Sequence, residues 1–71
     1  MDILKRARRR KFMTQREVAD AVGVSLQSYA AWERGTSAPR LRHVKRLCEV
    51  LELDPDVLLA ALPDEGKAVA A

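Results

Sequence analysis

Apolar residues recur along this chain at the spacing of helices, and no stretch shows the strict alternation of a half-buried strand. The clearest stripe lies in residues 41–51 and consists of Leu41, Val44, Leu47, Cys48 and Leu51. Each such stripe gives a helix one side to bury against the others. The pattern therefore predicts an all-α domain of five helices.

Residues that cap helices set the expected boundaries. Thr14 followed three residues later by Glu17 is a capping box, so a helix should begin at Gln15. Asp2 and Asp54 suit the N-cap positions of the first and last helices. The expected helices cover about residues 3–11, 15–22, 26–34, 39–51 and 55–62.

The second and third of these helices are joined by a tight turn. Gly23 stands where a left-handed residue ends one helix, Ser25 suits the N-cap of the next, and Gly35 ends that helix in turn. Tyr29 and Trp32 fall on one face of residues 26–34, together with Glu33; Gln27, Ala30, Ala31 and Arg34 fall on the other. This second face is the one offered to a partner, and the pair of helices has the size of a motif that lays one helix in the DNA major groove.

The end of the first helix poses a choice. Phe12 occupies a position where the chain must turn, so either the backbone avoids a left-handed residue or Phe12 accepts the strain of one. Met13, which follows it, is expected in the core.

The motif TQ-x-x-VA, followed by GVS-x(6)-WERG, resembles the Cro-like, xenobiotic-response-element (XRE) type of helix-turn-helix. This type is found in phage repressors, antitoxins and restriction controllers, and the resemblance covers roughly residues 3–62. It implies a repressor-like DNA-binding domain over residues 1–62, with the central helix-turn-helix as its reading element. Residues 63–71 lack bulky apolar side chains and are expected to form a flexible tail.

The resemblance also implies a set of DNA contacts. The positions that match base-contacting residues are Ser25, Leu26, Gln27, Ser28 and Ala31. Those that match contacts to the phosphate backbone are Arg8, Thr14, Gln15, Arg34, Thr36, Ser37 and Arg40. Arg8 is further expected to form an ion pair with Glu33. Among the base positions Gln27 carries the amide that pairs with adenine, whereas Leu26 and Ala31 can only touch a thymine methyl.

Charge is distributed unevenly along the chain. The net charge is +3, but residues 1–46 hold twelve of the thirteen Lys and Arg against four acids, and residues 47–71 hold one base against six acids. A basic front suits phosphate, which attracts cations at long range whatever the sequence. Double-stranded DNA is therefore the expected partner.

The fifth helix is more apolar than one small core requires. Val57, Leu58, Leu59 and Leu62 are expected to form a dimer interface, so that a homodimer would bind an inverted repeat. The alternative is that Leu58 or Leu59 covers the core from below.

A rival function from another class is a protein-interaction adaptor or antitoxin-type module that has kept the fold and has a protein partner. Its support is the apolar character of Leu26, Ala30 and Ala31.

Other chemistry finds little support. One histidine and the single Cys48 cannot build a metal site or a disulfide, so no metal and no cofactor are expected. No nucleophile, base and orienting group stand together, so an enzyme is not expected either. No apolar run approaches the length of a membrane span and no signal peptide is evident, so the expected location is the cytoplasm.

Overall fold

The computed structural model describes residues 1–62, and over these residues it contains five helices and no strand. They are α1 (Asp2–Arg10), α2 (Gln15–Val22), α3 (Leu26–Arg34), α4 (Leu41–Leu51) and α5 (Pro55–Ala61). The predicted all-α class is confirmed. The prediction of a flexible tail falls on residues 63–71, which lie outside the described residues.

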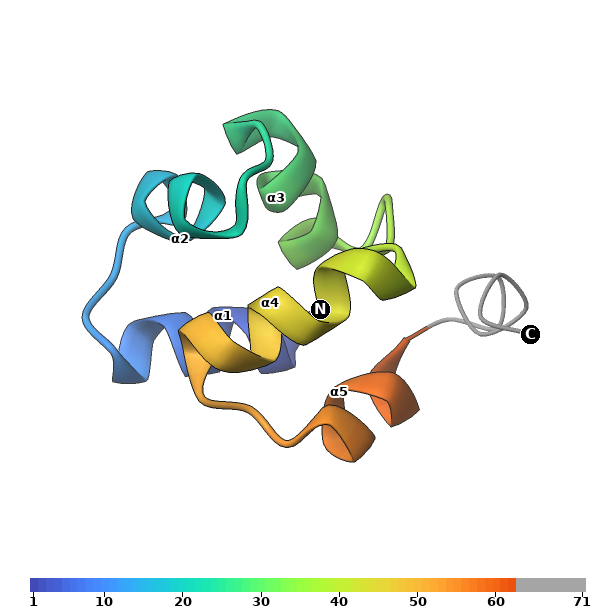
Figure 1. Cartoon of the computed structure of the whole chain (residues 1–71). Coiled ribbons are helices and arrows are strands. Elements are labelled where there is room, and N and C mark those ends of the chain that lie inside the picture. Colours follow the sequence, from blue (N-terminus) through green and yellow to red (C-terminus); the bar gives the residue numbers. More distant parts are fainter. Residues whose placement is uncertain (63–71) are drawn as a thin grey trace.

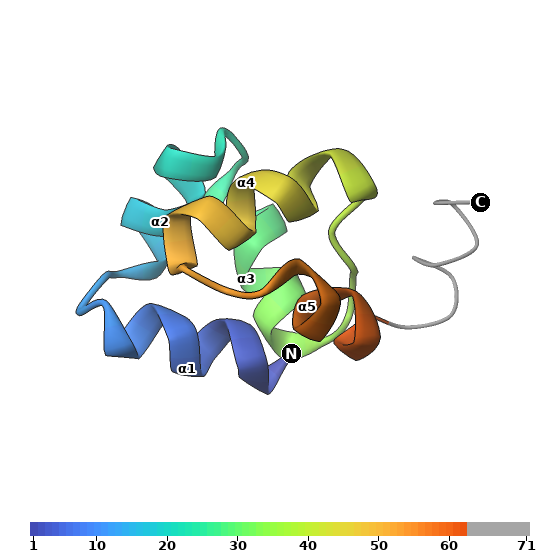
Figure 2. The ribbon, with the colours of Figure 1, turned by 60° about the horizontal axis from the view of Figure 1, so that its bottom comes forward.

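Helix α4 holds the fold together. It contacts α1, α2 and α5, while α3 contacts α1 and α2. Figure 1 shows α4 crossing the middle of the molecule between the α2–α3 pair and α5, and Figure 2 shows α1 along the bottom of the view with α4 above it. The core between these helices includes Leu4, Tyr29, Leu47 and Leu58, all fully buried. Burying side chains of this size contributes about 1.5 to 3 kcal/mol each.

The first helix begins one residue earlier than predicted. Its N-cap is Met1, and Asp2 makes no capping hydrogen bond. Asp2 instead pairs with Arg6 one turn later, at 3.0 Å. The amino group of Met1 donates to the carbonyl oxygens of Trp32 and Glu33, near the end of α3. Both carbonyls lie in the last turn of α3, where the regular intrahelical donors are missing. The Trp32 oxygen also accepts from the Gly35 N–H at 3.2 Å.

At the end of α1, Phe12 adopts left-handed backbone with φ 56°. Of the two alternatives, Phe12 accepts the strain. Its side chain is 95% exposed, so no packing within the described chain offsets the cost. Met13 is partly buried against the core.

The fourth helix begins two residues later than predicted. Arg40 is its N-cap, and Pro39 lies before the helix with its side chain fully buried. Leu41 was expected in the core but is 44% exposed, on the lining of a groove between α4 and α5. The rest of the predicted stripe, including Cys48, is buried.

Candidate nucleic-acid interface

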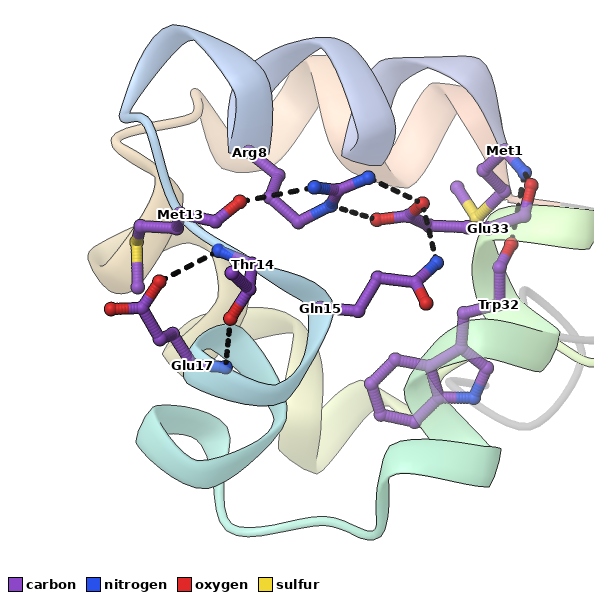
Figure 3. Close-up of polar contacts among 8 residues, drawn as sticks. All are labelled: Met1, Arg8, Met13, Thr14, Gln15, Glu17, Trp32 and Glu33. Carbon is purple, nitrogen blue, oxygen red and sulfur yellow. Dashed lines mark hydrogen bonds and ion pairs between the residues drawn. The ribbon is translucent and has the colours of Figure 1, made fainter.

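The start of α2 is fixed by reciprocal hydrogen bonds. The Thr14 hydroxyl accepts from the Glu17 backbone N–H at 3.0 Å, and the Glu17 carboxylate accepts from the Thr14 N–H at 2.8 Å. This is the predicted capping box, and Figure 3 shows both bonds. Two otherwise unpaired backbone donors are thereby satisfied. Thr14 is held at the surface at the end of α2 that carries the positive dipole.

The turn between α2 and α3 follows the sequence signals residue by residue. Gly23 has φ 89° and ends α2, and Ser25 caps α3 by accepting a hydrogen bond from the Ser28 N–H at 3.1 Å. Gly35 has φ 82° and ends α3. A side chain at either glycine would meet the strain of left-handed backbone. The turn and both ends of α3 are therefore defined by local chemistry.

Burial of one side of α3 decides which side faces outward. Tyr29 and Trp32 lie in the core, with their rings in an edge-to-face contact at 6.1 Å. The five predicted base-contacting residues lie away from them: Ser25, Gln27 and Ser28 are exposed, and Leu26 and Ala31 are half-buried. The Ser25 hydroxyl also donates to the Ser28 hydroxyl at 3.0 Å, which leaves the Ser28 proton available to another acceptor.

Arg8 and Glu33 lie together between α1 and α3. The Arg8 Nε donates to Glu33 Oε2 at 2.7 Å and Nη2 donates to Oε1 at 3.2 Å, a bidentate pair (Figure 3). The side chains are only 14% and 6% exposed. Arg8 Nη1 also donates to the Met13 carbonyl at 3.0 Å, so the same guanidinium ties the α1–α2 turn to α3.

Sequence reasoning missed the part that Gln15 plays in this network. Its amide nitrogen donates to Glu33 Oε1 at 3.0 Å, which links the start of α2 to the end of α3. Glu33 therefore accepts hydrogen bonds from two helices at once. No signal in the sequence separates this role from the predicted contact of Gln15 with phosphate.

The network changes the ionisation of its members. Burial opposes the charge on Glu33, but hydrogen bonds, led by that from Arg8, outweigh it and lower the pKa of Glu33. The hydrogen bond to Glu33 raises the pKa of Arg8, so this guanidinium stays charged. The Tyr29 hydroxyl is buried beside the pair and finds no hydrogen-bond partner among the described residues; burial raises the pKa of Tyr29 above its ordinary value.

The remaining predicted backbone contacts lie at the end of α3 and in the segment that follows it. Arg34, Thr36, Ser37 and Arg40 are all exposed. The Thr36 hydroxyl donates to the Ala31 carbonyl at 3.4 Å, which keeps the chain after Gly35 close to the end of α3. These polar side chains therefore border the exposed face of α3.

The predicted dimer interface on α5 needs correction. Leu58 is fully buried and Leu62 is 5% exposed, so both belong to the core of one chain and offer no surface to a second copy. Leu59 is half-buried and borders a groove between α4 and α5, whereas Val57 is 51% exposed on the side of α5 nearer α1. The alternative in which Leu58 covers the core is the one the structure adopts.

Among residues 1–62, no group of three metal-ligating side chains comes together. Cys48 is buried, and this burial raises the pKa of its thiol, which favours the unreactive protonated form. No helix in this part is long and apolar enough to span a membrane.

Comparison with known proteins agrees with this geometry. The family model described as Helix-turn-helix (HTH_3) matches residues 4–58, which include α2, α3 and the turn between them. The chain belongs to this XRE-type helix-turn-helix family. The fold is also similar to a solved structure: the N-terminal DNA-binding domain of SinR from Bacillus subtilis superposes with a TM-score of 0.75 at 24% identity, over 82% of this chain and 86% of that one.

Curated helix-turn-helix relatives are named as regulators of transcription. The uncharacterized HTH-type transcriptional regulator YqaE of Bacillus subtilis is 31% identical over 62 residues, covering 87% of this chain and 53% of its own. The phage CTXphi transcriptional repressor RstR of Vibrio cholerae is 36% identical over 45 residues, covering 63% of this chain and 40% of its own. The chain thus spans about half the length of the curated relatives it matches.

Proposed function

We propose that this chain binds double-stranded DNA and regulates transcription, with α3 in the major groove. The observation that carries the proposal is the exposed face of α3, which is held between two left-handed glycines and bordered by polar and basic side chains. A helix fixed in this way can present its first residues to base edges. RstR is named as a transcriptional repressor and the SinR domain as a DNA-binding domain, and both names support the same role.

Base reading is assigned to Ser25, Leu26, Gln27, Ser28 and Ala31. Gln27 is exposed, and no other described residue forms a hydrogen bond with its side chain. Its amide is thus available to donate to and accept from one adenine. Leu26 and Ala31 add only methyl contacts, so each copy of the chain would read few bases directly.

Backbone binding is assigned to residues on both sides of α3. Arg34 at the end of α3, and Thr36, Ser37 and Arg40 after it, would contact phosphates; Thr14 and Gln15 would do so at the start of α2. Arg8 uses three of its five N–H groups within the protein, so its main role is to position α3, and its contact with phosphate stays a prediction. Such contacts fix the register on DNA without reading the sequence.

Weak reading by one copy favours a dimer on an inverted repeat, with recognition helices about 34 Å apart. Two apolar residues suit the interface, the exposed Leu41 and the half-buried Leu59, and both border a groove of about 470 Å³ between α4 and α5. Lys45 and Glu49 lie on the same groove, four residues apart on α4. In a two-fold interface each Lys45 could face the Glu49 of the other copy, because such interfaces pair one patch with itself. The most direct role for the dimer is repression through occupation of a promoter.

Selection of bound duplexes from a random pool tests the proposal. The expected result is an enriched palindrome whose half-sites are centred about one helical turn apart. A matched selection with Gln27→Ala should recover the same spacing with one base position relaxed. Recovery of no preferred sequence in dilute salt would contradict the proposal and favour the adaptor role.

A further inference from the structure

A polar pocket of about 230 Å³ lies between α3 and the beginning of α4. Its polar side chains are Ser28, Ser37, Arg40, Arg42 and His43. None of the described side chains that line it is acidic. Two guanidinium groups, an imidazole and two hydroxyls therefore surround one small space, and all of them are able to donate hydrogen bonds to an anion.

His43 is held in this pocket by an aromatic contact. Its ring lies 5.6 Å from that of Trp32 at an angle of 39°, and Trp32 is itself buried. His43 Nε2 accepts a long hydrogen bond of 3.5 Å from the Arg42 Nε. Only a neutral imidazole has a nitrogen able to accept. The charged groups that face His43 are Arg40 and Arg42, because α3 contributes only Ser28 and Trp32 and the segment between the helices adds Ser37.

We propose that this pocket binds a phosphate group and that His43 takes up a proton as the phosphate binds. A phosphate bound among the imidazole and the two arginines would favour the protonated imidazole, because an opposite charge within about 4 to 6 Å favours the ionised form. Imidazole is also the side chain whose charge ordinarily changes between pH 5 and 8. Binding therefore becomes tighter as the pH falls through that range.

The phosphate has two sources that share this chemistry. Ser28 and Arg40 belong both to the pocket and to the proposed DNA contacts, so a backbone phosphate is one source, and this part rests on the proposed function. A small free oxyanion is the other. A free oxyanion would bind the pocket in the absence of DNA, whereas a backbone phosphate reaches it only when a duplex is bound.

Trp32 provides the measurement, because it is the only tryptophan of the chain and its ring lies against His43. A protonated imidazole quenches indole fluorescence more strongly than a neutral one. We expect the emission to fall as the pH is lowered from 8 to 5, with a midpoint that moves to higher pH in sodium sulfate relative to sodium chloride of equal ionic strength. Sulfate keeps its charge over this range and serves as the tetrahedral probe. A duplex should move the midpoint in the same direction.

Variants separate the pocket from general charge effects. His43→Gln should remove the pH-dependent step in Trp32 emission and should make the salt slope of duplex binding the same at pH 5.5 and pH 8. In the unaltered chain that slope should be steeper at pH 5.5 by about one unit, because one more cation meets phosphate. Arg42→Gln should reduce the shift caused by sulfate, whereas Lys5→Gln, which removes an exposed charge from α1 outside this pocket, should leave it unchanged.

Each outcome has a distinct meaning. A midpoint shift with sulfate and with DNA supports both sources; a shift with sulfate alone supports a free oxyanion, and a shift with DNA alone supports a backbone phosphate. A midpoint that neither probe moves, or a step that survives in His43→Gln, overturns the proposal. If the chain prefers no duplex but sulfate still moves the midpoint, the proposed function fails and the phosphate pocket stands.

Discussion

Direct base reading is proposed to depend mainly on Gln27. It occupies the second position of α3, is exposed, and carries an amide among neighbours that offer a hydroxyl or only methyl groups. We expect Gln27→Ala to cost about 1 to 3 kcal/mol at the matching base and to relax preference there. A binding titration over a randomised duplex library at two salt concentrations measures both effects.

Arg34→Ala is the matched control for this prediction. Arg34 is exposed at the end of the same helix, and a phosphate contact there should weaken binding to every duplex and reduce the salt slope by about one unit. Equal losses on every duplex for Gln27→Ala would show that Gln27 does not read a base.

Phe12 shows strain that the described part of the chain does not offset. A non-glycine residue in left-handed backbone costs about 1 kcal/mol or more, and the ring of Phe12 is almost fully exposed. We expect Phe12→Gly to raise the free energy of unfolding by about 1 kcal/mol. Urea denaturation followed by circular dichroism gives the value. Phe12→Ala is the control, because alanine removes the ring and keeps the strain; a similar gain in both variants would mean that strain is not the cause.

Local signals explain which single residues could be assigned from sequence. Thr14, Ser25 and Gly23 act on backbone groups within a few residues, so their roles follow from sequence spacing alone. Asp2 has the same capping chemistry, but the chain places Met1 at the cap. The hydrogen bond from Gln15 to Glu33 joins two helices, and no local rule predicts that these two side chains meet.

At the scale of the helices, the ion pair between Arg8 and Glu33 links α1 to α3. Removing one member leaves the other charge poorly solvated, so Glu33→Ala or Arg8→Ala should each lower the free energy of unfolding by about 3 kcal/mol. Denaturant unfolding measures this loss. The double variant should lose less than the sum of the single losses, because no uncompensated charge remains; simple additivity would argue against the pair.

The same pair predicts how stability depends on pH. The folded state lowers the pKa of Glu33 below its ordinary value of 4.5, so the stabilisation is complete at neutral pH. This stabilisation is lost as the pH falls from the ordinary pKa of the carboxyl to its lower pKa in the folded state. At that lower pKa the carboxyl protonates in the folded chain as well. Glu33→Gln should therefore flatten the dependence of unfolding free energy on pH in acid. An unchanged acid slope would contradict this assignment.

Helix α5 shows where an apolar pattern alone is ambiguous. More than one side of the helix is apolar, and the sequence could not decide which leucine is buried, because burial depends on how α4 and α5 meet. The structure buries Leu58 and leaves Leu59 at the groove. Leu41 shows the same limit on α4, since its place in the stripe predicts burial and its position in the first turn leaves it exposed.

At the scale of the whole molecule, the uneven charge and the α4–α5 groove suit two different contacts. Arg34 and Arg40 border α3 and suit phosphate, whereas the groove is lined mainly by apolar side chains and carries one charge of each sign, Lys45 and Glu49. A groove of that kind suits a second copy of the same chain better than a polyanion. Oligomeric state and DNA binding should therefore be separable by mutation.

Leu41→Glu tests the proposed interface with little risk to the fold, because Leu41 is 44% exposed at the edge of the groove. We expect it to shift the chain toward monomer in sedimentation equilibrium, and Leu59→Glu to do the same, since each places a carboxylate at an apolar contact. Val57→Glu is the matched control: Val57 is at least as exposed but lies on the other side of α5, so the dimer should persist. Leu58→Glu should instead unfold the chain, because it buries a charge in the core. If Leu41→Glu and Val57→Glu sediment alike while circular dichroism shows both folded, the α4–α5 groove is not the interface. The weak direct recognition of bases by a single copy would then have to be supplemented by recognition of DNA shape alone.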